Sequence, residues 1–192
     1  MKVTNKDGTP LHLVLVVPTG SKPSEDTAFS IRKELLTLGI ETEIKFVPWA
    51  TLLRQYVMNT VPGSNQQPAY NNGPQAVSQE AWDFILMGFN TNVIAPSGSH
   101  VFYTTDGGLN YFGYSNPEVD ELFNRVMSRE ALDEGARQQI YAEMSRVISD
   151  DQPVDFLVFN KSNVGFQKNV MGIDPGINMG YNDYLWHFET VK

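Results

Sequence analysis

The chain has 192 residues, 41% of them hydrophobic and 19% charged, so it can bury one sizeable core and is too apolar for a disordered chain. Its formal net charge of -8, without any run of lysine or arginine, excludes the basic surface that holds a nucleic acid, and we expect no nucleic-acid partner. The absence of cysteine excludes disulfides and thiolate chemistry within the chain, and no segment reaches the roughly 20 apolar residues of a membrane span.

The first predicted elements form a β-α-β unit. Leu11–Val17 is a short apolar run rich in β-branched residues, which predicts a buried strand. A helix is predicted to follow, with Ser24 as its N-cap and Gly39 just beyond its carboxyl end. Apolar and polar residues then alternate over Ile40–Phe46, as in a strand with one exposed face. Two parallel strands joined by a right-handed helical crossover predict an α/β fold with a mixed sheet flanked by helices.

The middle of the chain alternates short elements with long irregular segments. We predict a short helix over Thr51–Met58 and a buried strand over Trp82–Gly88. Between them, Asn59–Glu80 is rich in Pro, Gly, Asn, Gln and Ser, which predicts a long loop, either functional or a mobile surface insertion. Phe89–Gly108 is a second long irregular segment.

Two amphipathic helices and several short strands complete the predicted elements. Asn116, followed by a proline suited to the first helical position, is a favourable N-cap for one helix, and Asp133 can cap the next. Strands are predicted over Val154–Phe159, Asn163–Phe166 and Tyr184–Phe188. The apolar stripes expected to face the core are Val119, Leu122, Phe123 and Val126 on the first helix, and Ala136, Ile140, Met144, Val147 and Ile148 on the second.

Motifs for covalent or metal chemistry are missing from the sequence. His12, His100 and His187 have no second ligand at metal-binding spacing, so structural or surface roles fit them better. The acidic residues Asp150–Asp151 and Asp155 fit an exposed helix end better than a calcium loop or a pair of catalytic carboxylates. Because nucleophile elbows and phosphate-binding loops are also missing, we expect no enzymatic activity and no cofactor.

A neutral polar segment after the third predicted strand is the best candidate for binding. Phe89, Asn90, Thr91 and Asn92 leave the end of that strand and combine an aromatic ring with amide and hydroxyl groups. In open α/β sheets, ligands collect beyond the carboxyl ends of the strands. We therefore predict that these residues form a ligand-binding wall, the alternative being an ordinary polar loop.

A series of short motifs occurs in an order typical of one receptor family. The series comprises Leu38–Glu43, a segment containing Trp49, Trp82–Asp83 leading to Gly88–Phe89, Tyr114–Leu122, and Arg137–Tyr141. In this order the motifs resemble the second lobe of the family 5 extracellular solute-binding proteins, the dipeptide and oligopeptide receptors of bacterial ABC importers. The resemblance implies a single periplasmic-binding-protein-like lobe over residues 1–192, with a loop insertion over 59–80.

The resemblance also implies a mechanism and a set of partners. Family members close two lobes on a small solute, a peptide or another solute such as an oligosaccharide, and deliver it to ABC permease subunits. The family's first lobe and export signal do not occur in this chain, so we expect a fragment of a larger extracytoplasmic receptor, either periplasmic or a cell-surface lipoprotein.

One substitution bears on the ligand that the resemblance implies. In peptide-binding members an aspartate pairs with the amino terminus of the ligand, and Asn92 stands at the matching position here. Asparagine cannot supply that charge-assisted hydrogen bond. Phe89, where the family often has tryptophan, keeps an aromatic platform. The wall therefore suits a neutral, hydroxyl-rich ligand as well as a peptide.

A second class of function is regulatory. The same pair of lobes occurs in some bacterial regulators, where it is fused to a DNA-binding domain and senses a ligand. An export signal with a lipid-accepting cysteine before the first lobe would indicate a receptor, whereas a basic helix-turn-helix would indicate a sensor. A hydrolase would require a nucleophile and a base, which the sequence does not supply.

Overall fold

The structure is a computed structural model that describes residues 2–4, 6–88, 96–158, 167–168, 170–171 and 189–190. The chain divides into two units, residues 1–153 and residues 154–192. Within the described residues, every helix is too short or too polar to cross a membrane. That the whole chain forms a single lobe stays a prediction.

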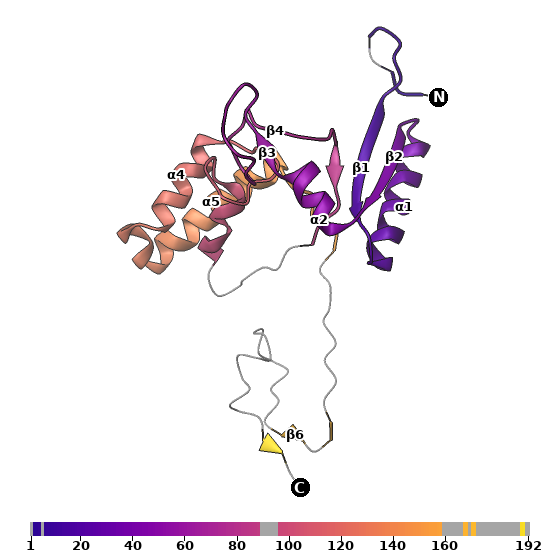
Figure 1. Cartoon of the computed structure of the whole chain (residues 1–192). Helices are drawn as coiled ribbons and strands as arrows, with labels where there is room; N and C mark the ends of the chain where they lie inside the picture. Colours follow the sequence, from indigo (N-terminus) through magenta and orange to yellow (C-terminus); the bar gives the residue numbers. More distant parts are fainter. Residues whose placement is uncertain are drawn as a thin grey trace. The chain divides into compact units, whose positions relative to one another are not determined.

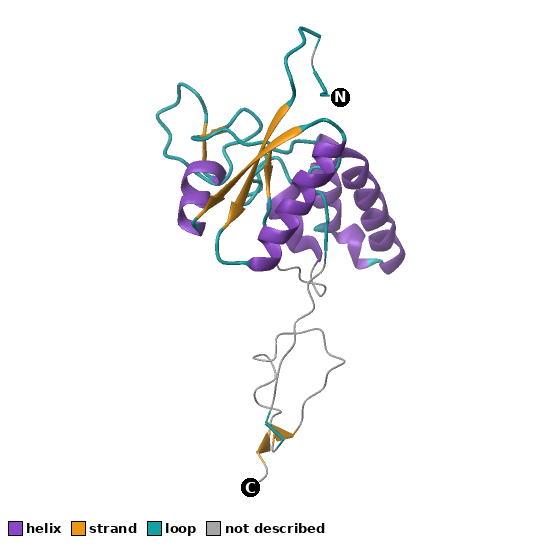
Figure 2. Cartoon of the chain, turned by 90° about the vertical axis from the view of Figure 1, so that its right-hand side faces the viewer, coloured by secondary structure: helices purple, strands orange, loops and turns teal. Residues whose placement is uncertain are grey.

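A parallel three-stranded sheet in the order β2-β1-β5 organises the first unit. Its strands are β1 (His12–Pro18), β2 (Glu41–Val47) and β5 (Phe84–Ile85). Helix α1 (Lys22–Thr37) joins β1 to β2, which run side by side in the same direction over their full length (Figures 1 and 2). The predicted β-α-β unit and the α/β fold class are therefore confirmed.

The two faces of this sheet carry separate apolar layers because successive side chains of a strand point to opposite sides. Leu15 and Val17 of β1 are buried with Ala28 of α1 on one face. Val16, between them in sequence, is buried with Leu52 and other residues of η1 (Leu52–Val57) on the opposite face. The sheet is thus flanked on both faces by helical segments.

Helix α1 begins earlier than the sequence predicted. Its N-cap is Ser21, whose hydroxyl oxygen accepts a hydrogen bond from the amide of Ser24. The prediction of Ser24 as the cap is wrong because Pro23 occupies the first turn, which places Ser24 inside the helix. At the other end, Gly39 has a φ of 79°, so the predicted glycine terminus is confirmed.

Two further elements differ from their predicted extent. The helix predicted over Thr51–Met58 starts at α2 (Trp49–Thr51) and continues as the wider π-helical turns of η1, where the Met58 amide donates to the Leu53 carbonyl. Of the strand predicted over Trp82–Gly88, only β5 pairs with β1. Beyond this pairing, the carboxylate of Asp83 accepts a hydrogen bond from the backbone amide of Val14 at 2.7 Å, and the Asp83 amide donates to the Val14 carbonyl at 3.0 Å.

The stretch from 59 to 80 is irregular apart from two short antiparallel strands, β3 (Asn59–Thr60) and β4 (Val77–Ser78). Asn59 also exchanges two backbone hydrogen bonds with Ala69, at 2.7 and 3.0 Å. We call this stretch the long loop. Its hydrogen bonds tie it to itself and to its surroundings, which composition alone did not predict. That it is an insertion relative to the family stays a prediction.

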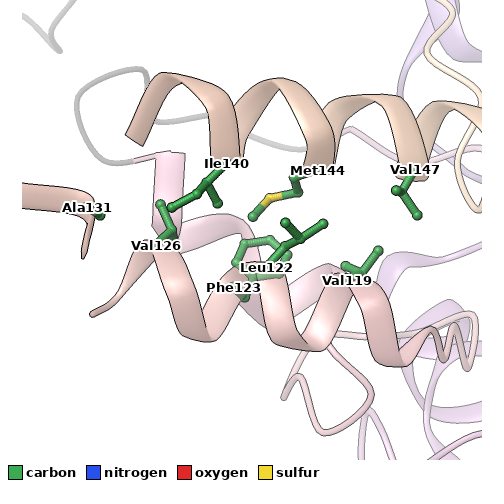
Figure 3. Packing of buried hydrophobic residues seen from close by; sticks show 8 residues of the cluster. All are labelled: Val119, Leu122, Phe123, Val126, Ala131, Ile140, Met144 and Val147. Atoms are coloured by element: carbon green, nitrogen blue, oxygen red, sulfur yellow. The ribbon is translucent and has the colours of Figure 1, made fainter. Parts of the chain in front are cut away.

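The second core of this unit lies between α4 (Pro117–Val126) and α5 (Glu134–Asp151), which η3 (Arg129–Leu132) connects. Asn116 caps α4 and Asp133 caps α5, as predicted, each accepting from a free amide of the first turn. Figure 3 shows the apolar side chains of the two helices directed toward one another. The buried members are Val119, Leu122, Phe123, Val126, Ala131, Ile140, Met144 and Val147.

The second unit is described only in part. It contains β6 (Val170–Met171) and β7 (Glu189–Thr190), an antiparallel pair that the sequence did not predict. The strand predicted over Val154–Phe159 is wrong for residues 154–158, which pair with no described strand to form a ladder. The strands predicted over Asn163–Phe166 and Tyr184–Phe188 lie outside the described residues.

Candidate functional site

The carboxyl ends of β1, β2 and β5 meet at one edge of the sheet because all three strands are parallel. We call this the carboxyl edge. The chain leaves it at Gly88, directly before the predicted wall. Phe89, Asn90, Thr91 and Asn92 themselves lie outside the described residues, which resume at 96. Their binding role therefore stays a prediction, while both flanks of the segment are described.

Trp49 is an aromatic side chain at the same edge that sequence reasoning used only as a family marker. It opens α2 two residues after the end of β2, and 48% of its surface is exposed. Tryptophan is usually well buried. A half-exposed tryptophan ring just beyond the end of β2 therefore suits contact with a ligand or partner. Its place after a predicted strand was the available sequence signal, but its exposure depends on the tertiary structure.

The chain that follows the predicted wall folds back on itself. It comprises η2 (Pro96–Ser99), α3 (His100–Tyr103) and a turn over residues 104–109, which together we call the return segment. The amide of Leu109 donates to the carbonyl of Val101 at 2.9 Å. Gly107 lies so close to α3 that a Cβ atom there would be 2.5 Å from the Val101 carbonyl oxygen. Only glycine fits this approach without moving the backbone.

Asp120 holds the return segment against the start of α4. Its carboxylate accepts a hydrogen bond from the Thr105 amide at 2.7 Å and another from the Thr105 hydroxyl at 2.6 Å. These contacts give Asp120 a structural role, because its carboxylate positions the turn that follows α3.

Asn110 closes the other side of the turn. It is fully buried and its side chain donates to the carbonyls of Thr104, at 3.1 Å, and Tyr114, at 2.7 Å. Its amide oxygen accepts from the Tyr114 backbone amide at 3.0 Å. A buried polar side chain with these partners rigidifies its surroundings because an unmade hydrogen bond there is costly.

The long loop reaches the same turn through Asn71. The side-chain amide of Asn71 donates to the carbonyls of Thr105, at 3.1 Å, and Gly107, at 2.8 Å. The long loop and the return segment are thereby joined by side-chain contacts across 34 and 36 positions of sequence. Sequence reasoning missed this residue, since an asparagine in a polar loop carries no signal of its partner.

Tyr114 and Asp151 connect the start of α4 to the end of α5. The Tyr114 hydroxyl donates to Asp151 Oδ2 at 2.5 Å, and the Asn116 side chain donates to the same oxygen at 2.7 Å. Burial, then the neighbouring Asp151 carboxylate, raises the pKa of Tyr114 well above its usual value. The hydrogen bonds from Tyr114 and Asn116 lower the pKa of Asp151. The pair therefore favours a neutral tyrosine and an ionised aspartate.

A hollow of about 450 Å³ lies on the long-loop side, lined by aromatic residues Trp82, Tyr111 and Phe112 and by neutral polar residues that include Ser78 and Gln79. Trp82 precedes β5, so the hollow lies toward the amino end of that strand, whereas the predicted wall follows its carboxyl end. Its lining carries no charged side chain, which suits a neutral occupant.

The histidine and acidic side chains of the described residues do not gather into a site. Within it, no three His, Asp or Glu side chains lie close enough together to hold a metal ion. His12 faces Glu43 at 3.7 Å on the exposed surface, and His100 packs edge-on against Phe123. His187 lies outside the described residues.

Known proteins share this fold and part of this sequence, although no protein-family model matches the chain. Over 174 residues the chain is 26% identical to the oligopeptide-binding protein AppA of Bacillus subtilis, a match that covers 88% of this chain and 28% of AppA. The structure of AppA in complex with a nonapeptide has a TM-score of 0.55 and 27% identity, over 78% of this chain and 26% of AppA.

More distant structures show the same fold. A putative peptide-binding protein AppA from Clostridium difficile has a TM-score of 0.56 at 21% identity, over 77% of this chain and 26% of that one. NikA from Staphylococcus aureus, in complex with Ni(L-His)2, has a TM-score of 0.56 at 22% identity, over 78% of this chain and 27% of its own. The chain thus spans 28% of the length of its Bacillus subtilis relative.

Proposed function

We propose that this chain, a homologue of the family 5 solute-binding proteins, is one ligand-binding lobe of an ABC-importer receptor. The lobe closes with a second lobe on a small solute outside the cytoplasm and hands the solute to a permease. It performs no covalent chemistry. The observation that carries the proposal is the carboxyl edge, where Trp49 is half-exposed and where β5 leads into the predicted wall.

The geometry supports a binding role in the expected place. In sheets of this topology, polar groups and aromatic rings gather where the strands end, and a ligand lies across those ends. Trp49 supplies an aromatic surface after β2, and Phe89 supplies another in the segment after β5. These rings follow the two outer strands of the β2-β1-β5 sheet, and aromatic rings at such an edge can pack against an apolar side chain or a sugar ring.

The ligand we favour is a peptide, since AppA of Bacillus subtilis, a relative of similar sequence, is named for oligopeptide binding and has been seen with a nonapeptide. Because the side chain of Asn92 is uncharged, we expect no ion pair between this position and the amino terminus of the peptide. The asparagine side chain offers a neutral acceptor instead, at about half the strength of a charge-assisted hydrogen bond. An oligosaccharide is the competing ligand class.

Isothermal titration of the two-lobe protein tests the proposal. A panel of unmodified and N-acetylated peptides of two to nine residues is compared with neutral oligosaccharides. For a ligand that binds, Trp49→Ala and Asn92→Ala should each raise the Kd by about tenfold. Leu132→Ala is the matched control, because this side chain is 81% exposed and belongs to η3, the connection from α4 to α5.

The outcomes separate the parts of the proposal. Unchanged affinity in both wall variants would remove the carboxyl edge from the binding site. Binding of oligosaccharides in place of peptides would keep the site and change the ligand class. Failure of every peptide and oligosaccharide to bind the intact protein would overturn the proposed function for these ligands.

A further inference from the structure

The hollow on the long-loop side has the size and the lining of a small-molecule site. Its volume is about 450 Å³, within the roughly 300–1,000 Å³ that is usual for such sites. We call it the aromatic hollow. Its lining combines three aromatic residues with three neutral polar ones, namely Trp82, Tyr111 and Phe112 with Asn59, Ser78 and Gln79.

Packing fixes the aromatic side of the hollow. The ring of Tyr111 lies edge-on to that of Tyr70, with 5.6 Å between centroids, and a third ring, Phe102, lies 6.5 Å from it. Trp82 and Tyr111 are both partly buried against the apolar core that contains Val16. Because these rings are already held in place, a ligand that packs against them has little side-chain motion to restrict.

The polar side of the hollow is built on the short β3-β4 pair. Asn59 and Ser78 are directly opposite each other in that pair, so their side chains lie on the same face. The amide of Glu80 donates to the carbonyl of Gln55 at 2.8 Å, which ties the chain after β4 to η1. The polar groups therefore stand on hydrogen-bonded backbone.

Asn59 offers an acceptor to a bound molecule. It is only 6% exposed, and its side-chain nitrogen donates to the carbonyls of Tyr70, at 3.4 Å, and Tyr111, at 3.5 Å. Among the described residues, Thr42 Oγ1 is the buried side-chain polar atom without a partner. The side-chain oxygen of Asn59 receives no hydrogen bond from a described residue, so solvent must reach it. A hydroxyl group in the hollow can donate to this oxygen.

The lining selects the chemistry of the occupant. A charged group would lose its hydration without gaining an ion partner, because no residue of the lining is charged. A wholly apolar molecule would cover the side chains of Asn59 and Gln79 without replacing their hydrogen bonds to water. A neutral sugar ring satisfies both conditions, since its CH groups can lie against aromatic rings while its hydroxyl groups donate and accept hydrogen bonds.

We propose that the aromatic hollow is a second binding site, which takes a neutral sugar ring. The hollow lies toward the amino end of β5, whereas Trp49 lies at the carboxyl edge, after the end of β2. The inference therefore does not rest on the proposed function, and the two can fail separately. It gives the long loop a binding role of its own, because Asn59, Ser78 and Gln79 belong to that loop.

Saturation-transfer NMR titrations of the intact protein with the methyl glycosides of glucose, galactose and mannose test the proposal. The usual affinity per atom of small ligands predicts a Kd of about 1 mM for a glycoside that binds. The strongest saturation should appear on the CH protons of one ring face, which pack against the aromatic rings. The methyl glycoside of glucuronic acid, which adds a carboxylate to the same ring, should bind at least about fivefold more weakly.

Two variants of the lining are each compared with a matched control. Phe112→Leu removes a ring and should raise the Kd about fivefold, whereas Phe29→Leu, at a 41% exposed ring of α1 outside the lining, should not. Gln79→Ala should raise the Kd about threefold, whereas Gln75→Ala, exposed in the same loop outside the lining, should not. Because Gln79 is exposed, its variant decides the test if Phe112→Leu fails to fold.

Four results would overturn the inference. One is the absence of saturation transfer for all three neutral glycosides at about ten times the expected Kd. Another is an unchanged Kd in both Phe112→Leu and Gln79→Ala. If Trp49→Ala weakens sugar binding while those two variants do not, the sugar binds at the carboxyl edge instead of the hollow. Equal affinity for the neutral and the charged glucose-type rings would contradict the selection of a neutral occupant.

Discussion

Asn110 is the residue whose replacement should most clearly reveal how the turn after the predicted wall is stabilised. It is fully buried and its side chain makes three hydrogen bonds, two donated and one accepted. Asn110→Ala removes all three, and it leaves the Thr104 carbonyl in a buried position without this donor. Asn110→Asp keeps the shape and the acceptor but replaces the donating amide with a carboxyl group.

The magnitude follows from these contacts. A neutral hydrogen bond contributes about 0.5–1.5 kcal/mol net, so the loss of three predicts a decrease of about 2–4 kcal/mol in the free energy of unfolding for Asn110→Ala. For Asn110→Asp, burial and the facing carbonyls raise the pKa of the new carboxyl group. The native state then favours its protonated form, so this variant should lose stability relative to wild type as the pH rises above about 4.

Urea unfolding followed by far-ultraviolet circular dichroism, at pH 5 and pH 8, measures both effects. With an m-value of about 2 kcal/mol/M, Asn110→Ala should move the midpoint by about 1–2 M. Asn124→Asp is the matched control, because Asn124 is exposed on α4 and gains the same charge. A loss below about 0.5 kcal/mol for Asn110→Ala, or a pH-independent loss for Asn110→Asp, would refute this account of the turn.

Three further changes have defined outcomes. Gly107→Ala should lower the midpoint of thermal unfolding, because the added Cβ would lie 2.5 Å from a backbone carbonyl oxygen. Gly108→Ala is the control and should leave the midpoint unchanged, because no atom lies within 4 Å of the added Cβ. Equal effects of the two changes would contradict the close approach at Gly107. The hydrogen bond from Tyr114 should make stability decline both as the pH falls through the lowered pKa of Asp151 and as it rises above 10.0, the ordinary pKa of tyrosine. Tyr114→Phe should weaken both declines in pH-dependent melting curves. Asn92→Asp should lower the Kd for peptides with a free amino terminus about fivefold and leave the Kd for N-acetylated peptides unchanged. Equal changes of the two Kd values in parallel titrations would argue against a contact with the amino terminus.

The elements that the sequence predicted well are those whose causes are local. Asn116 and Asp133 cap their helices because each precedes a favourable first turn. The apolar stripes of these two helices are buried by packing against one another. Ser21 and Ser24 show the limit of this reasoning, since both are serines near the same proline and only the backbone path distinguishes them.

Features of the candidate site depend on partners far away in sequence. Asn71 and Asp120 carry no pattern that identifies Thr105 as their common partner, at separations of 34 and 15 residues. Trp49 could be placed after a strand from sequence, but its exposure depends on what covers that edge. The carboxylate of Asp83 binds the amide of Val14, 69 residues away, a contact that a period-two pattern cannot encode.

The outer edge of β2 bears on how the chain behaves in concentrated solution. In the strand order of the described sheet, β2 is an edge strand, and such an edge offers its backbone groups to a strand from another molecule. Glu41, Glu43 and Lys45 recur along it at every second position. A second copy that paired here in parallel and in register would bring like charges together and strip water from them, which disfavours stacking of copies in that arrangement. The alternation that predicts the strand thus also helps keep copies of the chain apart.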